Sequence, residues 1–142
     1  MDKIGARFEL LDDPVSRCEE FRPFCPSVLC ERQAEYSENT FHAPFMVVTF
    51  PVNQNVADTM PAVVHVDNTA RIQSVHADSN PLYDRLIGEF AEATLLPVLI
   101  NTSLNINEQS TMNAPLEALH TYFLHGLDVL YLGNYRLTIA GG

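Results

Sequence analysis

The alternation of apolar and polar positions predicts several short strands before the first long helix. Strand composition, rich in β-branched and aromatic residues, is found near Ser27 to Glu31 and in the proline-bounded run APFMVVTFPV, which we expect to end at Pro51. In AVVHVDNTARIQSV, two further β-rich runs flank Asp67 and Asn68. Because an Asp-Asn pair favours the positive φ of a tight turn, this segment predicts a β-hairpin.

Two amphipathic helices are predicted in the second half of the chain. The first begins at Asn80-Pro81 and continues at helical spacing to about Thr94. The second opens at Asn113-Ala114-Pro115 and ends before Gly126, a residue type that often follows a helix. The side chains expected to face the core are Leu82, Leu86, Ile87, Phe90 and Ala91 in the first helix, and Leu116, Leu119, Phe123 and Leu124 in the second.

Strands are also predicted between and after the helices. The nearly continuous apolar run LPVLINTS has the pattern of a central strand covered on both faces. The runs DVLYLG and YRLTIA, joined at Gly133-Asn134, predict a terminal hairpin. This order of elements predicts a single domain of 1–142 with an α/β (α+β) fold, in which helices flank a mixed sheet.

Composition narrows the possible functions. The chain has 142 residues, of which 46% are hydrophobic, as expected for one globular domain. A formal net charge of −10 and a single lysine, Lys3, argue against a nucleic-acid-binding surface. The apolar runs are far shorter than the roughly 20 residues of a membrane span, and the start has no signal-peptide pattern. We therefore expect a cytoplasmic location without membrane contact.

The three cysteines do not have the pattern of a disulfide framework or a zinc site. Cys18, Cys25 and Cys30 are odd in number and lack C-x-x-C spacing. We expect reduced thiols that serve in packing. The sequence also shows no cluster of His and acidic residues suited to a metal.

The segment with most polar chemistry follows the predicted central strand. Asn101-Thr102-Ser103-Leu104-Asn105 brings four hydrogen-bonding side chains together, where backbone N–H groups are also free to face an anion or a ribose. The alternative interpretation is an ordinary turn capped by Asn and Ser.

Two arginines are further candidates for anion binding. His65, Asp67 and Arg71 flank the predicted hairpin turn, and His65 and Asp67 share one face if the segment is a strand. Arg71 is equally explained as a solvated charge on an edge strand. Arg22 lies between two phenylalanines in FRPF, a stiff context that favours bidentate anion binding, although stacking on an aromatic ring is the alternative.

Three motifs, F-R-P-F-x-P, H-V-D-x-T-A-R-x-Q and N-T-S-x-N, occur in this order and are followed by APLEALHTYFLHGLDVLYLGNY. On these residues nearly the whole chain resembles the C-terminal, YrdC-like domain of the O-carbamoyltransferases of antibiotic and nodulation-factor biosynthesis. The resemblance implies a YrdC-like twisted mixed sheet flanked by helices.

The resemblance also implies a chemistry. The YrdC-like domain binds ATP, as its Mg²⁺ complex, together with carbamoyl phosphate, and makes carbamoyl-adenylate with release of pyrophosphate and phosphate. A preceding metal-binding domain then passes the carbamoyl group to a substrate hydroxyl. That domain is missing from this chain, so we expect a truncation at the N-terminal edge. The expected partners are a separate metal-binding domain or a second copy.

Family motif positions assign roles to individual residues. The resemblance implies phosphate and nucleotide contacts for four of them, among which Arg71 and Ser103 are the expected catalytic residues. The other four are supporting residues of the same nucleotide-binding site. The first group is Arg22, Arg71, Ser103 and Asn105, and the second is His65, Asp67, Thr69 and Asn101.

Some positions depart from the family pattern. The family segment V-K-x-R-E is replaced here by a stretch with Ser16 and Cys18 in place of its two cations. Asn68 replaces a glycine, and residues 108–110 (Glu, Gln, Ser) replace G-E-P. Two hypotheses follow: a carbamoyltransferase C-terminal domain, whose activity on its own stays open, or a non-catalytic nucleotide-binding or interaction module that kept the fold.

Overall fold

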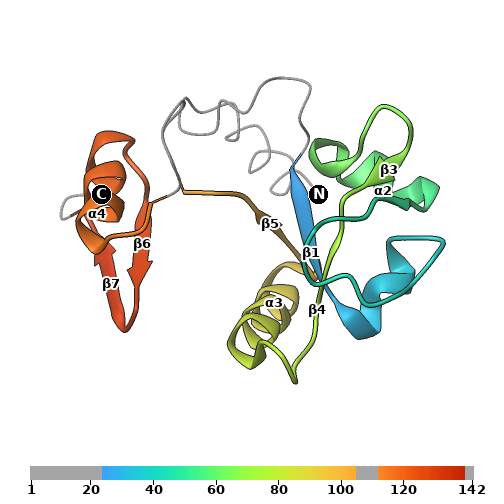
Figure 1. The fold of residues 1–142 in the computed structure, drawn as a ribbon, viewed down its shortest axis with the longest axis horizontal. Coiled ribbons are helices and arrows are strands. Elements are labelled where there is room, and N and C mark those ends of the chain that lie inside the picture. Colours follow the sequence, from blue (N-terminus) through green and yellow to red (C-terminus); the bar gives the residue numbers. More distant parts are fainter. Residues whose placement is uncertain (1–23, 105–111, 140–142) are drawn as a thin grey trace. The chain divides into compact units, whose positions relative to one another are not determined.

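The computed structural model describes residues 24–104 and 112–139, which fall into two compact units (Figure 1). The large unit comprises residues 24–102, and the small unit comprises the described residues from 103 onward. Within these ranges, no helix is both long and apolar enough to cross a membrane. Helices and strands are mixed in the chain, which confirms the predicted α+β class.

The large unit is built on a mixed three-stranded sheet in the order β4-β1-β5. Strand β1 (Cys25–Leu29) runs parallel to β4 (Gln73–Val75) and antiparallel to β5 (Val98–Asn101). All five residues of β1 are buried, as expected for the middle strand. The strand predicted near Ser27 is thus confirmed, two residues earlier than expected.

The prediction that LPVLINTS forms the central strand is wrong. This run does form β5, but among the described residues β5 pairs only with β1 and lies at the edge of the sheet. Residues 99–101 are only partly buried. The central strand is instead β1, because it pairs with β4 on one side and with β5 on the other. That strand is CPSVL, whose Pro and Ser weaken its sequence signal.

Helix α3 (Pro81–Thr94) has the predicted bounds. The Asn80 side chain accepts a hydrogen bond from the backbone N–H of Tyr83 at 3.3 Å, and Leu95 ends the helix with φ +64°. Ile87 is fully buried against the sheet, whereas Leu82 and Leu86 are 82% and 54% exposed. The predicted core face is therefore wrong for these two leucines, because the sheet covers only a narrow strip of the helix.

The long strand predicted from APFMVVTFPV is also wrong. Of this run, Phe50–Pro51 forms strand β2 and Val52 makes a single bridge to Ser37, while Met46 has a φ of +56°. The backbone N–H of Ala43 donates to Ser74 Oγ at 2.7 Å, and the Ser74 N–H donates back to the Ala43 carbonyl at 3.0 Å. These two bonds hold Ala43 against β4. The start of the run is therefore irregular, although its composition favours a strand.

The predicted hairpin around Asp67 is correct in its turn and wrong in its pairing. Asn68 has the expected positive φ, +59°. The run before it forms the short 3₁₀ helix η4 (Pro61–Val63) instead of a strand, since Pro61 is well suited to a first helical position. Strand β3 (Thr69–Ala70) consequently pairs with β2.

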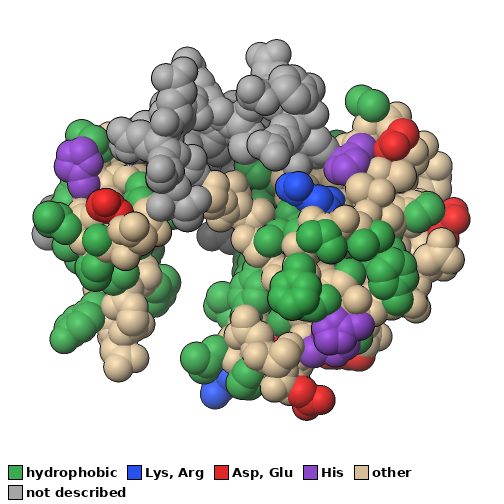
Figure 2. Space-filling model, in the orientation of Figure 1, with side chains coloured by type: hydrophobic (Ala, Val, Ile, Leu, Met, Phe, Trp, Pro, Cys, Tyr) green, Lys and Arg blue, Asp and Glu red, His purple; other side chains and the backbone are tan. Residues whose placement is uncertain are grey.

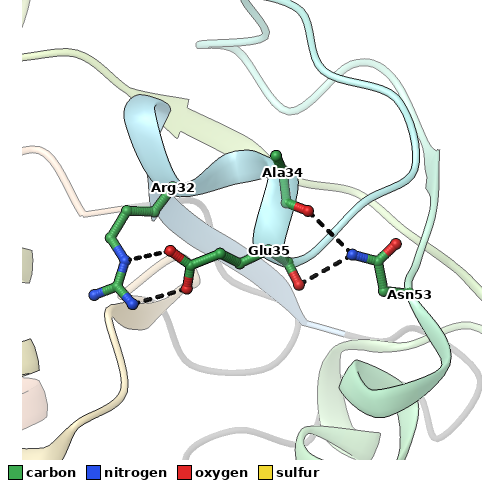
Figure 3. Close-up of polar contacts among 4 residues, drawn as sticks. All are labelled: Arg32, Ala34, Glu35 and Asn53. Carbon is green, nitrogen blue, oxygen red and sulfur yellow. Dashed lines mark hydrogen bonds and ion pairs between the residues drawn. The ribbon is translucent and has the colours of Figure 1, made fainter.

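Two short helical segments complete the large unit. The 3₁₀ helix η3 (Cys30–Glu35) follows β1, and α2 (Gln54–Thr59) follows β2. The side-chain amide of Asn53 donates to the carbonyls of Ala34 and Glu35, each at 3.1 Å, which joins the two segments (Figure 3). The main core lies between these elements and the sheet, with Val28, Phe50, Met60, Val63, Ala70 and Ile72 at most 1% exposed.

The small unit contains α4 (Pro115–Leu124) and the hairpin of β6 (Val129–Leu132) and β7 (Tyr135–Thr138). Both predicted elements are confirmed, with Gly126 and Gly133 at positive φ. The predicted core face of the helix is wrong, because Leu116, Phe123 and Leu124 are exposed. Its buried face is instead the one that packs on β6, made of Ala118, Thr121 and Tyr122.

Candidate functional site

The polar side chains of interest in the large unit gather at one end of the three-stranded sheet. Strands β1 and β4 begin at this end, and the antiparallel β5 finishes there. In the ladder, Cys25 is opposite Asn101, and Ser27 is opposite Gln73. Because alternate residues of a strand share a face, these four side chains belong to one face of the sheet.

Arg71 comes to the same place, two residues before β4. The Cys25 thiol donates a hydrogen bond to the backbone carbonyl of Arg71. Burial raises the pKa of the Cys25 thiol to about 11, and the positive charge of the Arg71 guanidinium acts in the opposite direction. Within the described part of the chain, neither ion pair involves Arg71, since these join Arg32 to Glu35 and Arg85 to Glu89. Among the described residues, the guanidinium therefore has no carboxylate partner.

Gln73 connects the three strands through its side chain. Its Oε1 accepts hydrogen bonds from Ser27 Oγ and from Asn101 Nδ2, both at 2.7 Å. Its Nε2 donates to the Pro44 carbonyl at 3.0 Å. The amide groups at this end of the sheet are consequently held in fixed orientations.

A second polar group occupies the turn before β3. Asp67 accepts hydrogen bonds from the backbone N–H of Thr69 at 3.1 Å and from its hydroxyl at 2.7 Å. These bonds, together with the nearby His65, lower the pKa of the Asp67 carboxyl. Since the Thr69 hydroxyl donates to the carboxylate, its oxygen accepts from His65 Nδ1, 3.0 Å away. His65 and Asp67 thus meet through Thr69 in a turn, and the shared face that they would have in a strand does not apply.

The structure brings some of the predicted site residues together. Arg71 and Asn101 flank Cys25 at the sheet end, and the turn that holds His65, Asp67 and Thr69 lies immediately before Arg71 in the chain. On the face shown in Figure 2, basic, histidine and acidic side chains lie next to one another on the surface near β3. The alternative of an edge-strand charge does not describe Arg71, which is half-buried beside β1.

Other predicted residues are not joined to this group. Ser103 is exposed and belongs to the small unit, which begins directly after Thr102. Arg22 and Asn105 lie outside the described residues, as do Ser16, Cys18 and residues 108–110. The predicted contacts of these residues with phosphate and nucleotide stay predictions.

Sequence reasoning did not place Gln73, Ser27 or Cys25 at the candidate site. Gln73 is the last residue of the H-V-D-x-T-A-R-x-Q motif, two positions after Arg71, and this spacing places both on one face of an extended chain. That signal was available in the sequence. The contributions of Ser27 and Cys25 depend on strand register, which the sequence does not reveal.

The group can bind an anion and orient its neighbours. It offers a cation without a carboxylate partner, amides of fixed orientation and a histidine. Within residues 24–104 and 112–139, no group of three His, Cys, Asp or Glu side chains is placed to hold a metal. Cys25 and Cys30 are free thiols, as predicted, and Cys25 is buried. Such a set supports binding and charge stabilisation.

Comparison with known proteins gives a consistent result. Residues 5–138 match the family model described as "Carbamoyltransferase C-terminus". Nodulation protein NolO of Bradyrhizobium diazoefficiens is 36% identical over 124 residues, which cover 85% of this chain and 23% of that protein. The 3'-hydroxymethylcephem-O-carbamoyltransferase of Streptomyces clavuligerus is 37% identical over 99 residues, covering 70% of this chain and 19% of that enzyme.

The chain therefore spans about a fifth of the length of these relatives. The family match nevertheless extends over nearly all of its residues, including the three-stranded sheet and the residues at the end where Arg71 and Asn101 lie. On this evidence, the chain belongs to the carbamoyltransferase C-terminal family.

Proposed function

We infer that this chain is the part of an O-carbamoyltransferase that binds carbamoyl phosphate and ATP and forms carbamoyl-adenylate. The observation that carries the proposal is the position of Arg71. Its guanidinium lies beside Cys25 at the sheet end and has no ion-pair partner among the described residues. A half-buried cation of this kind is suited to the phosphate of a small anionic substrate.

The polar surroundings of Arg71 support the same function. Asn101 offers an amide at the end of β5, and the turn containing His65 and Thr69 precedes the arginine. Substrate phosphates and ribose hydroxyls need such donors and acceptors in fixed positions more than they need a nucleophile. Asn105 and Arg22 belong to the proposed site through the family motifs alone.

The proposed reaction balances with one water molecule. Water splits carbamoyl phosphate into carbamate and inorganic phosphate. A carbamate oxygen then attacks the α-phosphorus of ATP, the new O–P bond forms, and the bond between the α- and β-phosphates breaks with release of pyrophosphate. Arg71 would stabilise the charge on the phosphate oxygens during these steps. A hydrogen bond from Ser103 is implied by the family motif alone.

Transfer to a hydroxyl acceptor is assigned to a partner. The relatives are several times longer than this chain, and large apolar side chains of the large unit, such as Leu82, Phe45 and Val47, are exposed. We assign these exposed apolar side chains to contact with a metal-binding carbamoyltransferase domain, with a second copy as the competing occupant. Light scattering of the isolated chain separates the two, because only self-association doubles its mass.

Calorimetric titration tests the substrate assignment. Carbamoyl phosphate and ATP with Mg²⁺ are titrated into the purified chain, and pyrophosphate release is followed with and without a metal-binding carbamoyltransferase domain. Arg71→Gln is expected to weaken carbamoyl phosphate binding by about 10- to 100-fold, since a charge-assisted hydrogen bond contributes about 1.5–3 kcal/mol.

Arg85→Gln is the matched control for this titration. Arg85 is an exposed arginine of α3, paired with Glu89 at 3.4 Å, and its loss should change the affinity less than twofold. An absence of both heat and pyrophosphate in every combination would reject the proposal. Equal weakening by both variants would reject the role of Arg71.

The second candidate is a non-catalytic nucleotide-binding or interaction module. Ser16 and Cys18 favour it, because they stand where the family has a lysine and an arginine. The double substitution Ser16→Lys and Cys18→Arg distinguishes the two. If the wild-type chain fails to bind nucleotide and the double variant binds it, the remaining site is intact and the chain has lost its activity through these two changes.

A further inference from the structure

The orientation of the Gln73 side chain follows from one backbone group. A carbonyl oxygen can only accept a hydrogen bond, so the atom of Gln73 that lies 3.0 Å from the Pro44 carbonyl must be the amide nitrogen. The other end of the same amide, Oε1, then faces Ser27 and Asn101 as an acceptor. This removes the usual ambiguity between the nitrogen and oxygen of a glutamine amide.

The orientation of Asn101 follows in turn. Because Gln73 Oε1 accepts, the atom of Asn101 at 2.7 Å from it must be the donor Nδ2. Asn101 Oδ1 therefore points away from Gln73. It has no hydrogen-bond partner among the described residues, and the residue is only partly buried. The network thus presents a hydrogen-bond acceptor of fixed direction at the end of β5.

Arg71 and Asn101 both lie next to Cys25. Asn101 is directly opposite Cys25 in the antiparallel ladder, where paired Cα atoms lie about 4.5–5.5 Å apart. The Cys25 thiol in turn donates to the backbone carbonyl of Arg71, and the Arg71 guanidinium lies near enough to the thiol to act on its pKa. A cation and an oriented acceptor therefore flank the same residue.

We propose that Asn101 Oδ1 accepts a hydrogen bond from the amino group of carbamoyl phosphate and thereby selects this substrate over acetyl phosphate. The proposal rests on the proposed function, which supplies the phosphate at Arg71. The two ligands share the acyl-phosphate group and differ in that an amino group in one is a methyl group in the other. A methyl group cannot donate to Oδ1, and it would exclude the water that otherwise satisfies this oxygen.

The size of the selectivity follows from this difference. Sites that hydrogen-bond a substrate NH reject analogues without it more strongly than apolar pockets reject a change of size. We expect the wild-type chain to bind carbamoyl phosphate at least tenfold more tightly than acetyl phosphate. A site that recognises only the phosphate would bind both equally.

Titration of both ligands into the wild-type chain and two variants tests the proposal. In Asn101→Leu, which has nearly the shape of asparagine and lacks the acceptor, acetyl phosphate should bind at least as tightly as carbamoyl phosphate. In Asn101→Ala, the ratio of the two affinities should fall to within twofold of one. Either variant alone decides the outcome if the other fails to fold, as judged by circular dichroism.

Asn53→Ala is the matched control, because Asn53 also holds two backbone carbonyls but lies between η3 and α2. It should keep the wild-type ratio of affinities. Equal binding of both ligands by the wild-type chain, or unchanged selectivity in Asn101→Leu, overturns the proposal and leaves the proposed function standing. Binding of neither ligand by the wild-type chain rejects the proposed function and this proposal together.

Discussion

Asn101 at the end of β5 donates a hydrogen bond to Gln73 at the start of β4 over 2.7 Å, although β1 lies between these two strands. The bond passes across the face of β1 that carries Ser27, whose hydroxyl donates to the same oxygen. The H-V-D-x-T-A-R-x-Q motif and the N-T-S-x-N motif are thus physically joined. One glutamine side chain couples the candidate binding residues to the stability of the sheet.

The first prediction concerns this glutamine. Gln73→Ala should lower the free energy of unfolding by about 2–3 kcal/mol, because it leaves the fully buried Ser27 hydroxyl without an acceptor and removes two further hydrogen bonds. Urea unfolding followed by circular dichroism measures the change. Gln54→Ala, at the exposed start of α2, should have little effect. A loss below about 0.5 kcal/mol for Gln73→Ala would contradict the network described here.

The second prediction concerns the packing of α3 on the sheet. Ile87 is completely buried with Leu29 and Val75, so Ile87→Ala should cost about 2–4 kcal/mol of stability. Leu86→Ala removes a side chain of the same size from the neighbouring position, which is 54% exposed, and should cost less than half as much. Thermal and urea unfolding of the two variants give the comparison, and equal losses would mean that the helix packs through another face.

The third prediction concerns the turn before β3. Asn68 has a φ of +59°, a conformation that glycine adopts without the steric cost of a side chain and that asparagine tolerates better than alanine. Asn68→Ala should therefore destabilise the fold by about 1 kcal/mol, whereas Asn68→Gly should be nearly neutral. Urea midpoints decide between them. A neutral alanine variant would show that the turn does not hold this residue in the left-handed region.

The fourth prediction concerns the response to acid. The pKa of Asp67 is lowered, first by the Thr69 hydroxyl, so the stabilisation that the carboxylate provides is complete above the ordinary aspartate pKa and is lost as pH falls through the lower folded value. Asp67→Asn cannot titrate. The stability difference between wild type and this variant should therefore shrink as the pH is lowered below about 4.

Unfolding midpoints at several pH values between 7 and 3 provide the measurement for Asp67. Asp58→Asn serves as the control, since Asp58 is an exposed carboxylate of α2 without a hydrogen-bond partner among the described residues. A difference between wild type and Asp67→Asn that stays constant over this range would show that the Thr69 hydroxyl does not favour the ionised carboxylate.

Local chemistry allowed the helix bounds and turns to be predicted. Asn80 and Pro81 start α3, Gly126 follows α4, and Gly133 and Asn68 adopt the positive φ expected of them. Each of these features depends on the conformational preference of one or two residues. The same residues behave similarly in any fold, so the surrounding structure is not needed to recognise them.

Pairing and burial were predicted less well. The sequence pattern placed β5 at the centre of the sheet and gave APFMVVTFPV a full strand, but β1 occupies the centre and Ala43 is bound at the edge of β4 by Ser74. Leu82 and Leu116 have helical spacing and remain exposed. A periodic pattern shows which side chains could be buried, whereas the available partner surface decides which ones are.

The amino-acid sequence by itself determined the α+β class, the two helices, the tight turns and, through its motifs, the family. Only the tertiary structure decided that Cys25 stands between Arg71 and Asn101 and that Gln73 orients the asparagine amide. Motif residues are visible in sequence because each carries its own chemistry. Their relative positions depend on strand register, which arises from contacts between segments that are distant in the chain.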